Sequence, residues 1–282
     1  MRRPTEVLFW TGAGLCALAA CAVLAGIVGA IVARGLPALS WSFLVQDARE
    51  AGAAGGILYQ LAGTVILIVT ALAVAAPPAV ALALLRTVYL AERGARRLRL
   101  ALYAWNGVPS VVFGVFGLVV FVRGFGWGKS WLAGGIVLGL MILPTLTVAL
   151  AERMAAVPEE SLEAAYGLGL TRSRVVLAVI LPQSAGGFLS GALLGLARAA
   201  GETAPILFTA AVFSGATLPS GVRESPILAL PYHIFVLAQD SLDPGAVSRL
   251  WAAAFVLLAL VFGLSLLSLP ARLRSHAEAR DA

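Results

Sequence analysis

Long runs of apolar residues dominate the chain, and short polar stretches separate them. A helix needs about 20 mainly apolar residues to cross the hydrocarbon core of a bilayer. This criterion predicts six membrane-spanning helices, at residues 8–33, 57–85, 101–122, 132–151, 186–213 and 250–270. We therefore predict an all-α, polytopic membrane protein with a single transmembrane domain over residues 1–282, and six spans place both ends on one side of the membrane.

Three apolar features need separate interpretation. The run 8–33 is longer than the core of a cleavable signal, which has about 7 to 15 residues, so we expect an uncleaved helix. The run 227–238 is short and contains a proline, so we expect it to lie at the interface or to re-enter the membrane. Pro77 and Pro78 remove backbone donors inside the second span and predict a kink or a local break there.

The distribution of Lys and Arg predicts the orientation, because cytoplasmic segments retain positive charge. With the N-terminus inside, thirteen of the 20 basic residues fall in inner segments, six fall in outer segments, and Arg198 lies within a span. Both termini are therefore expected in the cytoplasm. A seventh span at 227–238 would move the C-terminal arginines outside, which argues against it.

Composition narrows the functional classes. The chain is 60% hydrophobic and 12% charged, about half the charged fraction of a soluble domain. The net charge of +6 does not indicate a nucleic-acid partner, because the basic residues lie between apolar runs rather than on the face of a soluble fold. The two histidines are isolated, and we see no catalytic dyad or metal cluster. We predict a protein that is not an enzyme and has no metal or nucleotide cofactor of its own.

The polar segment 152–183, between the fourth and fifth spans, is long for a connection between neighbouring helices. Glutamates near its start favour a helix N-terminus, and Gly167 or Gly169 can end that helix in a left-handed conformation. Thr171 can cap a second helix, which should stop at Pro182. The pattern predicts a short helix, a turn and a second helix on the cytoplasmic face.

The fifth span combines small residues with charge. Gly187, Gly191 and Gly195 recur every four residues and allow another helix to approach closely. At about 100° per residue, Arg198 and Glu202 lie near the glycine face, and a charge facing lipid would be costly. One interpretation is a structural ion pair within one helical turn. The other is that Arg198 offers its planar donors to a tetrahedral oxyanion on a translocation pathway.

The segment 152–183 resembles the cytoplasmic signature loop of ABC-importer permeases, which docks on the ATPase subunit. The matching residues are Glu163, Ala164, Ala165, Gly169, Leu181 and Pro182. Val179 departs from the isoleucine that is typical of the family. The resemblance implies that the glutamate meets a basic residue of the ATPase and that the two alanines allow close docking.

The fifth span also resembles a narrower group. Residues 197–209, with the sequence ARAAGETAPILFT, are similar to the characteristic stretch of phosphate-importer permeases, and residues 109–114 and 89–92 also resemble that family. The Ala-Pro pair after Gly-Glu-Thr looks more like the PstA-type subunit than its PstC-type partner. The resemblance implies an ABC-importer permease fold with a cytoplasmic coupling helix.

The resemblance also implies a function and partners. It suggests an inner-membrane subunit that imports inorganic phosphate, with Arg198, Glu202 and Thr203 on the pathway. Its partners would be a PstC-type second permease, a dimer of cytoplasmic ATPase subunits that holds ATP and Mg, and a soluble extracytoplasmic phosphate-binding protein. One alternative is another oxyanion, sulfate or molybdate. A secondary transporter or channel is less well supported, because inverted sequence repeats are not evident.

Overall fold

The computed structural model describes residues 4–49, 52, 54–215, 218–239 and 243–278. Its α-helices are α1 (Pro4–Gly35), α2 (Trp41–Val45), α3 (Leu58–Leu84), α4 (Glu92–Asn106), α5 (Ser110–Gly117), α6 (Trp131–Ala155), α7 (Glu159–Gly167), α8 (Arg172–Val175), α9 (Leu181–Ala200), α10 (Ala204–Thr209), α11 (Leu230–Leu237) and α12 (Pro244–Glu278). The other elements are the 3-10 helix η1 (Leu36–Ala38), the π-helical segments η3 (Leu85–Tyr89), η4 (Leu118–Gly124) and η5 (Val176–Ile180), and a short antiparallel hairpin, β1 (Ala48–Arg49) and β2 (Ala54–Gly55). The predicted all-α class is confirmed.

Among the described residues, five helices are long and apolar enough to cross a membrane, or six if a bent pair of helices counts as one span. The five are Phe9–Ala38, Leu58–Tyr89, Trp131–Ala155, Arg172–Ala200 and Pro244–Leu267, and the bent pair is Glu92–Asn106 with Ser110–Gly124. The chain is a multi-pass membrane protein.

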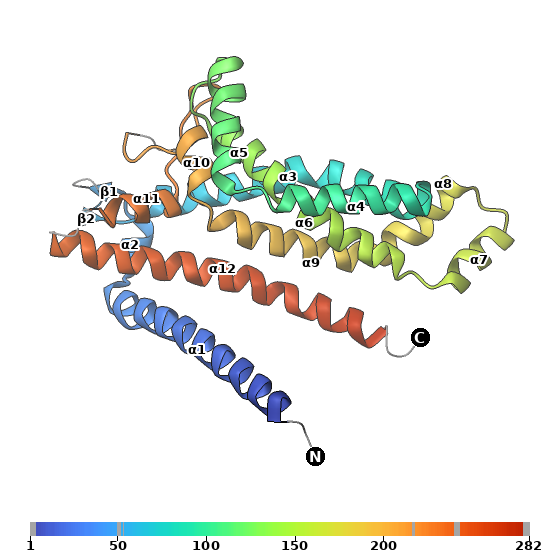
Figure 1. The fold of residues 1–282 in the computed structure, drawn as a ribbon. Coiled ribbons are helices and arrows are strands. Elements are labelled where there is room, and N and C mark those ends of the chain that lie inside the picture. Colours follow the sequence, from blue (N-terminus) through green and yellow to red (C-terminus); the bar gives the residue numbers. More distant parts are fainter. Residues whose placement is uncertain (1–3, 50–51, 53, 216–217, 240–242, 279–282) are drawn as a thin grey trace.

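The core lies where α3, α6 and α9 pack together (Figure 1). Fully buried apolar side chains of α3 and α6, among them Leu67, Leu138, Ile142 and Leu146, fill the space between these helices. Helix α12 covers α9, and α1 lies at the edge of the molecule on α12. Most of α1 exposes large apolar side chains such as Leu18, which is 68% exposed, as expected of a helix whose surroundings are lipid.

The elements outside the spans gather at two opposite ends of the bundle. Helix α7 stands at one end, while the hairpin, α2 and α11 lie at the other (Figure 1). The first turn of α1 and the last turn of α12 point toward the end where α7 lies. At the opposite end, Lys129 donates from Nζ to the carbonyl oxygens of Leu207 and Ala211, at 3.0 and 3.2 Å. The ammonium group thus satisfies carbonyl groups at the C-terminal end of α10.

The predicted span 101–122 is not one straight helix. Helices α4 and α5 meet at an angle of 86° across residues 107–109. Pro109 has no backbone N–H and disfavours helical geometry at the residue before it, and Gly107 gains little from staying helical. The prediction was wrong here because it counted apolar residues and gave no weight to these two helix breakers.

The predicted span 186–213 also needs correction at both ends. The continuous helix begins at Arg172 and ends at Ala200, where Gly201 is the C-cap. The predicted stop at Pro182 does not occur, because the π-helical turn η5 precedes the proline and Leu181 N–H bonds to the carbonyl of Val176. This wider turn relieves the clash that a proline ring makes with the carbonyl four residues earlier.

The proline prediction for the second span has a different outcome. Helix α3 runs without a break through Pro77 and Pro78, so the predicted local break does not occur. Buried contacts on both sides, at Ala75 and Ala79, hold α3 against its neighbours and keep it continuous.

The segment 227–238 packs on the bundle through α11. Gly63 of α3 lies so close to the Leu228 carbonyl that an added Cβ would collide with it. The Thr64 hydroxyl accepts a hydrogen bond from Leu230 N–H at 2.9 Å and donates to Gln60 O at 2.8 Å. A small residue and a bridging hydroxyl thus fix the start of α11 against the second span.

Burial lowers the pKa of His233 in α11 from 6.5 to about 4. The side chain is 3% exposed and stacks on Phe213, with ring centroids 5.9 Å apart. The unfolded chain takes up this proton near pH 6.5 and the folded protein only near pH 4, so stability should fall as pH drops through this window. At pH 5 we expect a loss of about 2 kcal/mol relative to pH 7.5.

Thermal unfolding of the purified protein at pH 7.5 and 5 checks this expectation. His233→Gln, which cannot take up the proton, should show a smaller change between the two pH values. An equal loss of stability in both proteins would show that other groups cause the pH dependence.

Candidate translocation site and coupling segment

Arg198 lies in the last turn of α9, where a positive charge is favoured by the helix dipole. Its Nη1 donates a hydrogen bond of 2.6 Å to Oδ1 of Asn106, the last residue of α4. Its Nε lies 4.0 Å from Oε1 of Glu202. The Arg198 side chain remains 35% exposed, so the guanidinium keeps donors available for a further acceptor.

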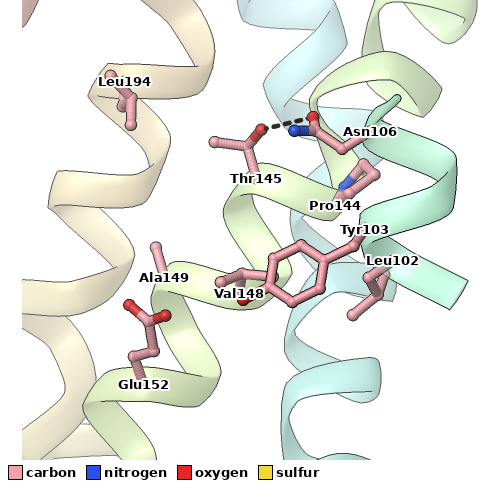
Figure 2. Close-up of a pocket in the computed structure, with 9 residues that line it drawn as sticks. All are labelled: Leu102, Tyr103, Asn106, Pro144, Thr145, Val148, Ala149, Glu152 and Leu194. Atoms are coloured by element: carbon pink, nitrogen blue, oxygen red, sulfur yellow. Dashed lines mark hydrogen bonds between the residues drawn. The ribbon is translucent and has the colours of Figure 1, made fainter. Parts of the chain in front are cut away.

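A cavity of about 250 Å³ lies beside Asn106, the acceptor of the Arg198 hydrogen bond (Figure 2). Its lining comes from three helices and comprises Leu102, Tyr103, Asn106, Pro144, Thr145, Val148, Ala149, Glu152 and Leu194. Asn106 and Thr145 lie at one end of this lining and Glu152 lies at the other (Figure 2). Thr145 Oγ1 donates to Asn106 Oδ1 at 3.5 Å, so this oxygen is shared between Thr145 and Arg198. Polar groups of α4, α6 and α9 therefore converge beside one cavity.

The bend between α4 and α5 and the end of α9 belong to this same region. Helix α4 turns into α5 after Asn106, and α9 gives way to α10 after Arg198. Helices α5 and α10 then pack together, because Gly114 leaves room for the backbone of Ala204 and Pro205. The Arg198–Asn106 hydrogen bond thus joins the end of α4 to the end of α9. A movement of α5 or α10 would therefore act on the other through this bond.

Glu202 and Thr203 lie in the non-helical turn between α9 and α10. Glu202 is 21% exposed, and Thr203 is the N-cap of α10, although its side chain makes no capping hydrogen bond. The predicted ion pair is present at the limit of contact, but Asn106 is the shorter partner of Arg198. Arg198 and Glu202 therefore lie close together although α9 ends before Glu202, and Asn106 is a partner of Arg198 that the sequence did not indicate.

Gly187, Gly191 and Gly195 of α9 face α6. An added Cβ at Gly187 would collide with the Arg153 side chain, and one at Gly191 would lie 2.9 Å from Ala149 Cβ. Gly195 has its nearest neighbour, Ile142, at 3.5 Å. The small residues allow close approach of the two helices that line the cavity.

We expect Gly191→Val to destabilise the protein by about 1–3 kcal/mol, because the new side chain would overlap Ala149 and Leu146. Gly186→Val is the matched control, since a Cβ at Gly186 of the same helix has nothing within 4 Å. Thermal unfolding in detergent measures both. Equal effects of the two substitutions would contradict close packing as the cause.

The loop that resembles the ATPase-docking segment is shorter than the predicted range 152–183. Residues 152–155 belong to α6, and residues from 172 onward belong to the helix that continues into α9. In this segment only α7 and its flanking turns lie outside the spanning helices, at the tip of the bundle (Figure 1). Gly169 adopts φ +75°, the left-handed conformation predicted for the turn, and Thr171 is the N-cap of α8.

The six docking candidates do not share one surface. Glu163, Ala164, Gly169 and Pro182 are exposed, whereas Ala165 is 5% exposed and Leu181 is half-buried. Ala165 belongs to the apolar core together with Val175 and Val176, so it holds α7 in place instead of offering a surface. Leu168, which is 83% exposed, was not singled out from the sequence and extends the exposed surface of the turn.

Asn106 and Thr145 are the site residues that sequence reasoning missed. Asn106 is followed by Gly107 and Pro109, and such clusters of breakers indicate the end of a helix. That signal could have placed a polar helix terminus inside the membrane, where it needs a partner. Thr145 carries no comparable signal, because a threonine inside a span commonly bonds to its own helix.

The fold and its long apolar helices define a polytopic membrane protein. The family described as the binding-protein-dependent transport system inner membrane component matches residues 74–274. The chain belongs to this family of ABC-importer permeases.

Named relatives and a solved structure agree with that assignment. The chain is 31% identical over 270 residues to the phosphate transport system permease protein PstA 2 of Mycobacterium bovis, with 93% of this chain and 87% of the relative covered. It is 32% identical over 266 residues to the probable phosphate transport system permease protein PstA of Methanocaldococcus jannaschii, with 92% and 90% covered. The fold resembles a chain of the inward-facing MetNI methionine ABC transporter, with a TM-score of 0.54, 15% identity, and 79% of this chain and 94% of that chain covered.

Proposed function

We propose that this chain is a PstA-type permease subunit that translocates inorganic phosphate into the cell. The observation that carries the proposal is the guanidinium of Arg198, a planar hydrogen-bond donor that lies between two broken helices and beside a polar-ended cavity. Relatives named as phosphate permeases over about nine-tenths of the chain support phosphate as the anion.

The geometry suggests how an anion could pass. Phosphate would replace or share Asn106 as the acceptor for Arg198, because a charged acceptor forms a stronger bond than an amide oxygen. Glu202 would orient the guanidinium and, as an anion itself, would keep the phosphate from binding too tightly. The bends on either side would let α5 and α10 move when Arg198 changes partner. Thr203, in the turn beside Glu202, would line the same pathway.

Permeases of this family work with partner subunits. We infer a PstC-type second permease that completes the pathway, two cytoplasmic ATPase subunits that hold ATP and Mg, and an extracytoplasmic phosphate-binding protein. Glu163 and Ala164 on α7, with Gly169 in the following turn and Pro182 at the start of α9, would contact the ATPase. Both termini would then lie in the cytoplasm, and the excess of Lys and Arg in the segments expected on that side supports this orientation.

The test is uptake of labelled phosphate into vesicles that hold this chain with the partner permease, ATPase and binding protein. Uptake should require ATP and should persist with excess sulfate or molybdate outside. Competition by either anion would assign the importer to that oxyanion. Uptake without the ATPase would contradict an ATP-driven importer and favour a secondary transporter or channel.

A further inference from the structure

A second polar pocket lies at the end of the bundle where α7 stands, between η3 and α4. It has a volume of about 200 Å³ and is lined by Arg86, Glu92, Ala95, Arg96 and Arg99. Three arginines face one glutamate, so the pocket carries a net positive charge. The pocket shares no lining residue with the cavity beside Arg198.

Arg86 is the member that most requires a ligand. Its Nη1 is shielded from solvent and has no hydrogen-bond partner in the described part of the chain. A buried charged donor without an acceptor is costly, and such groups are normally paired. Arg86 also lies in a π-helical turn, a distortion that is frequent at functional sites.

Exposed apolar residues lie close in sequence to the residues that line the pocket. Leu85 and Tyr89 of η3 are 40% and 51% exposed, and Leu100 of α4 is 57% exposed. Helix α4 is amphipathic, with arginines concentrated in its first half and aromatic residues near its end. Such a helix, with basic side chains next to exposed apolar ones, suits the boundary between headgroups and acyl chains.

We propose that this pocket binds the phosphate group of an anionic phospholipid. The three guanidinium groups would hold the phosphate oxygens, with Arg86 donating its shielded nitrogen. The acyl chains would lie over Leu85, Tyr89 and Leu100. Basic pockets between transmembrane helices are a recognised mode of headgroup binding. The apolar rim favours a lipid over free phosphate, although both present the same chemistry.

Lipid retention by the purified transporter complex tests the proposal. After exchange into detergent with equal phosphatidylglycerol and phosphatidylcholine, native mass spectrometry should show phosphatidylglycerol retained on the wild-type complex. The double variant Arg86→Gln and Arg99→Gln should retain at least tenfold less phosphatidylglycerol than the wild-type complex. The matched control, Arg93→Gln with Arg97→Gln, removes the same charge from exposed positions on α4 that do not line the pocket and should retain the lipid.

Several outcomes would overturn the assignment. Equal retention by the two double variants would show that general positive charge, not the pocket, holds the lipid. Displacement of phosphatidylglycerol by inorganic phosphate at matched concentration would make the pocket a site for free phosphate. Loss of the ATPase subunit with lipid retention unchanged would assign the arginines to a carboxylate of that partner.

A measurement on the wild-type protein guards against a variant that fails to fold. A phosphatidylglycerol probe with a photoreactive group near its headgroup should label residues 85–100, and excess unlabelled phosphatidylglycerol should compete. Labelling spread evenly over the spans would contradict a defined site. Phosphate uptake plays no part in either readout, so the inference can fail while the proposed function stands.

Discussion

Arg198→Gln is expected to reduce ATP-driven phosphate uptake by roughly 10- to 100-fold. Hydrogen bonds to charged groups contribute about 1.5–3 kcal/mol, and each 1.4 kcal/mol is a factor of ten. Glutamine keeps a donor but loses the charge and the forked geometry. Uptake into vesicles of the complete complex, with binding-protein and ATPase amounts held constant, measures the effect.

Two further variants separate a pathway role from a structural role for Arg198. Arg198→Lys keeps the charge and should restore part of the uptake if the anion contacts this side chain. Asn106→Ala removes the oxygen that accepts the 2.6 Å hydrogen bond from Arg198. It should weaken uptake less than Arg198→Gln, because it leaves the guanidinium in place. If Arg198→Gln instead lowers thermal stability and assembly together with uptake, the bond between the two bends is its main role.

Glu163→Lys is expected to uncouple transport from ATP hydrolysis. Glu163 is exposed on α7, at the tip of the bundle, and removing one partner of an interfacial charge pair costs about 2–5 kcal/mol. Co-purification of the ATPase should therefore fall at least tenfold, and phosphate uptake should fall with it. The variant should remain in the membrane in normal amounts, because the residue makes no contribution to the buried core.

A control in the same helix distinguishes docking from helix stability. Glu160→Lys makes the same charge change in the first turn of α7, about 60° around the helix from Glu163. It should weaken α7 slightly through the helix dipole but leave most ATPase binding intact. Normal uptake by Glu163→Lys would exclude this residue from coupling, and an equal loss in both variants would indicate that α7 has simply unfolded.

The sequence predicted those parts of the fold that depend on neighbouring residues. Apolar runs mark the spans because each helix satisfies its own backbone hydrogen bonds in lipid. The left-handed turn at Gly169 follows from the preference of a single residue and was predicted correctly, and Thr171 stands at the N-cap position of α8 without a capping hydrogen bond from its side chain. The glycine face of α9 was also visible, because helical periodicity is a local property.

Three of the wrong helix predictions involve proline. A proline can end a helix, as at Pro109, or lie within one, as at Pro77, and a π-helical turn can absorb it, as before Pro182. The choice depends on which neighbouring helix packs there and whether the freed backbone groups find partners. The number of apolar residues and the positions of prolines and glycines do not show which helix packs there or where the freed backbone groups find partners.

By itself the sequence determined the membrane class, the helical character and the residues that can carry charge within the bilayer. Only the tertiary structure decided that Arg198 meets Asn106, a residue 92 positions away, and that both lie at helix bends beside one cavity. Helical periodicity places a side chain on a face of its own helix. The partner on that face is set by how the helices pack, because an arginine in the membrane takes whichever acceptor the neighbouring helix presents.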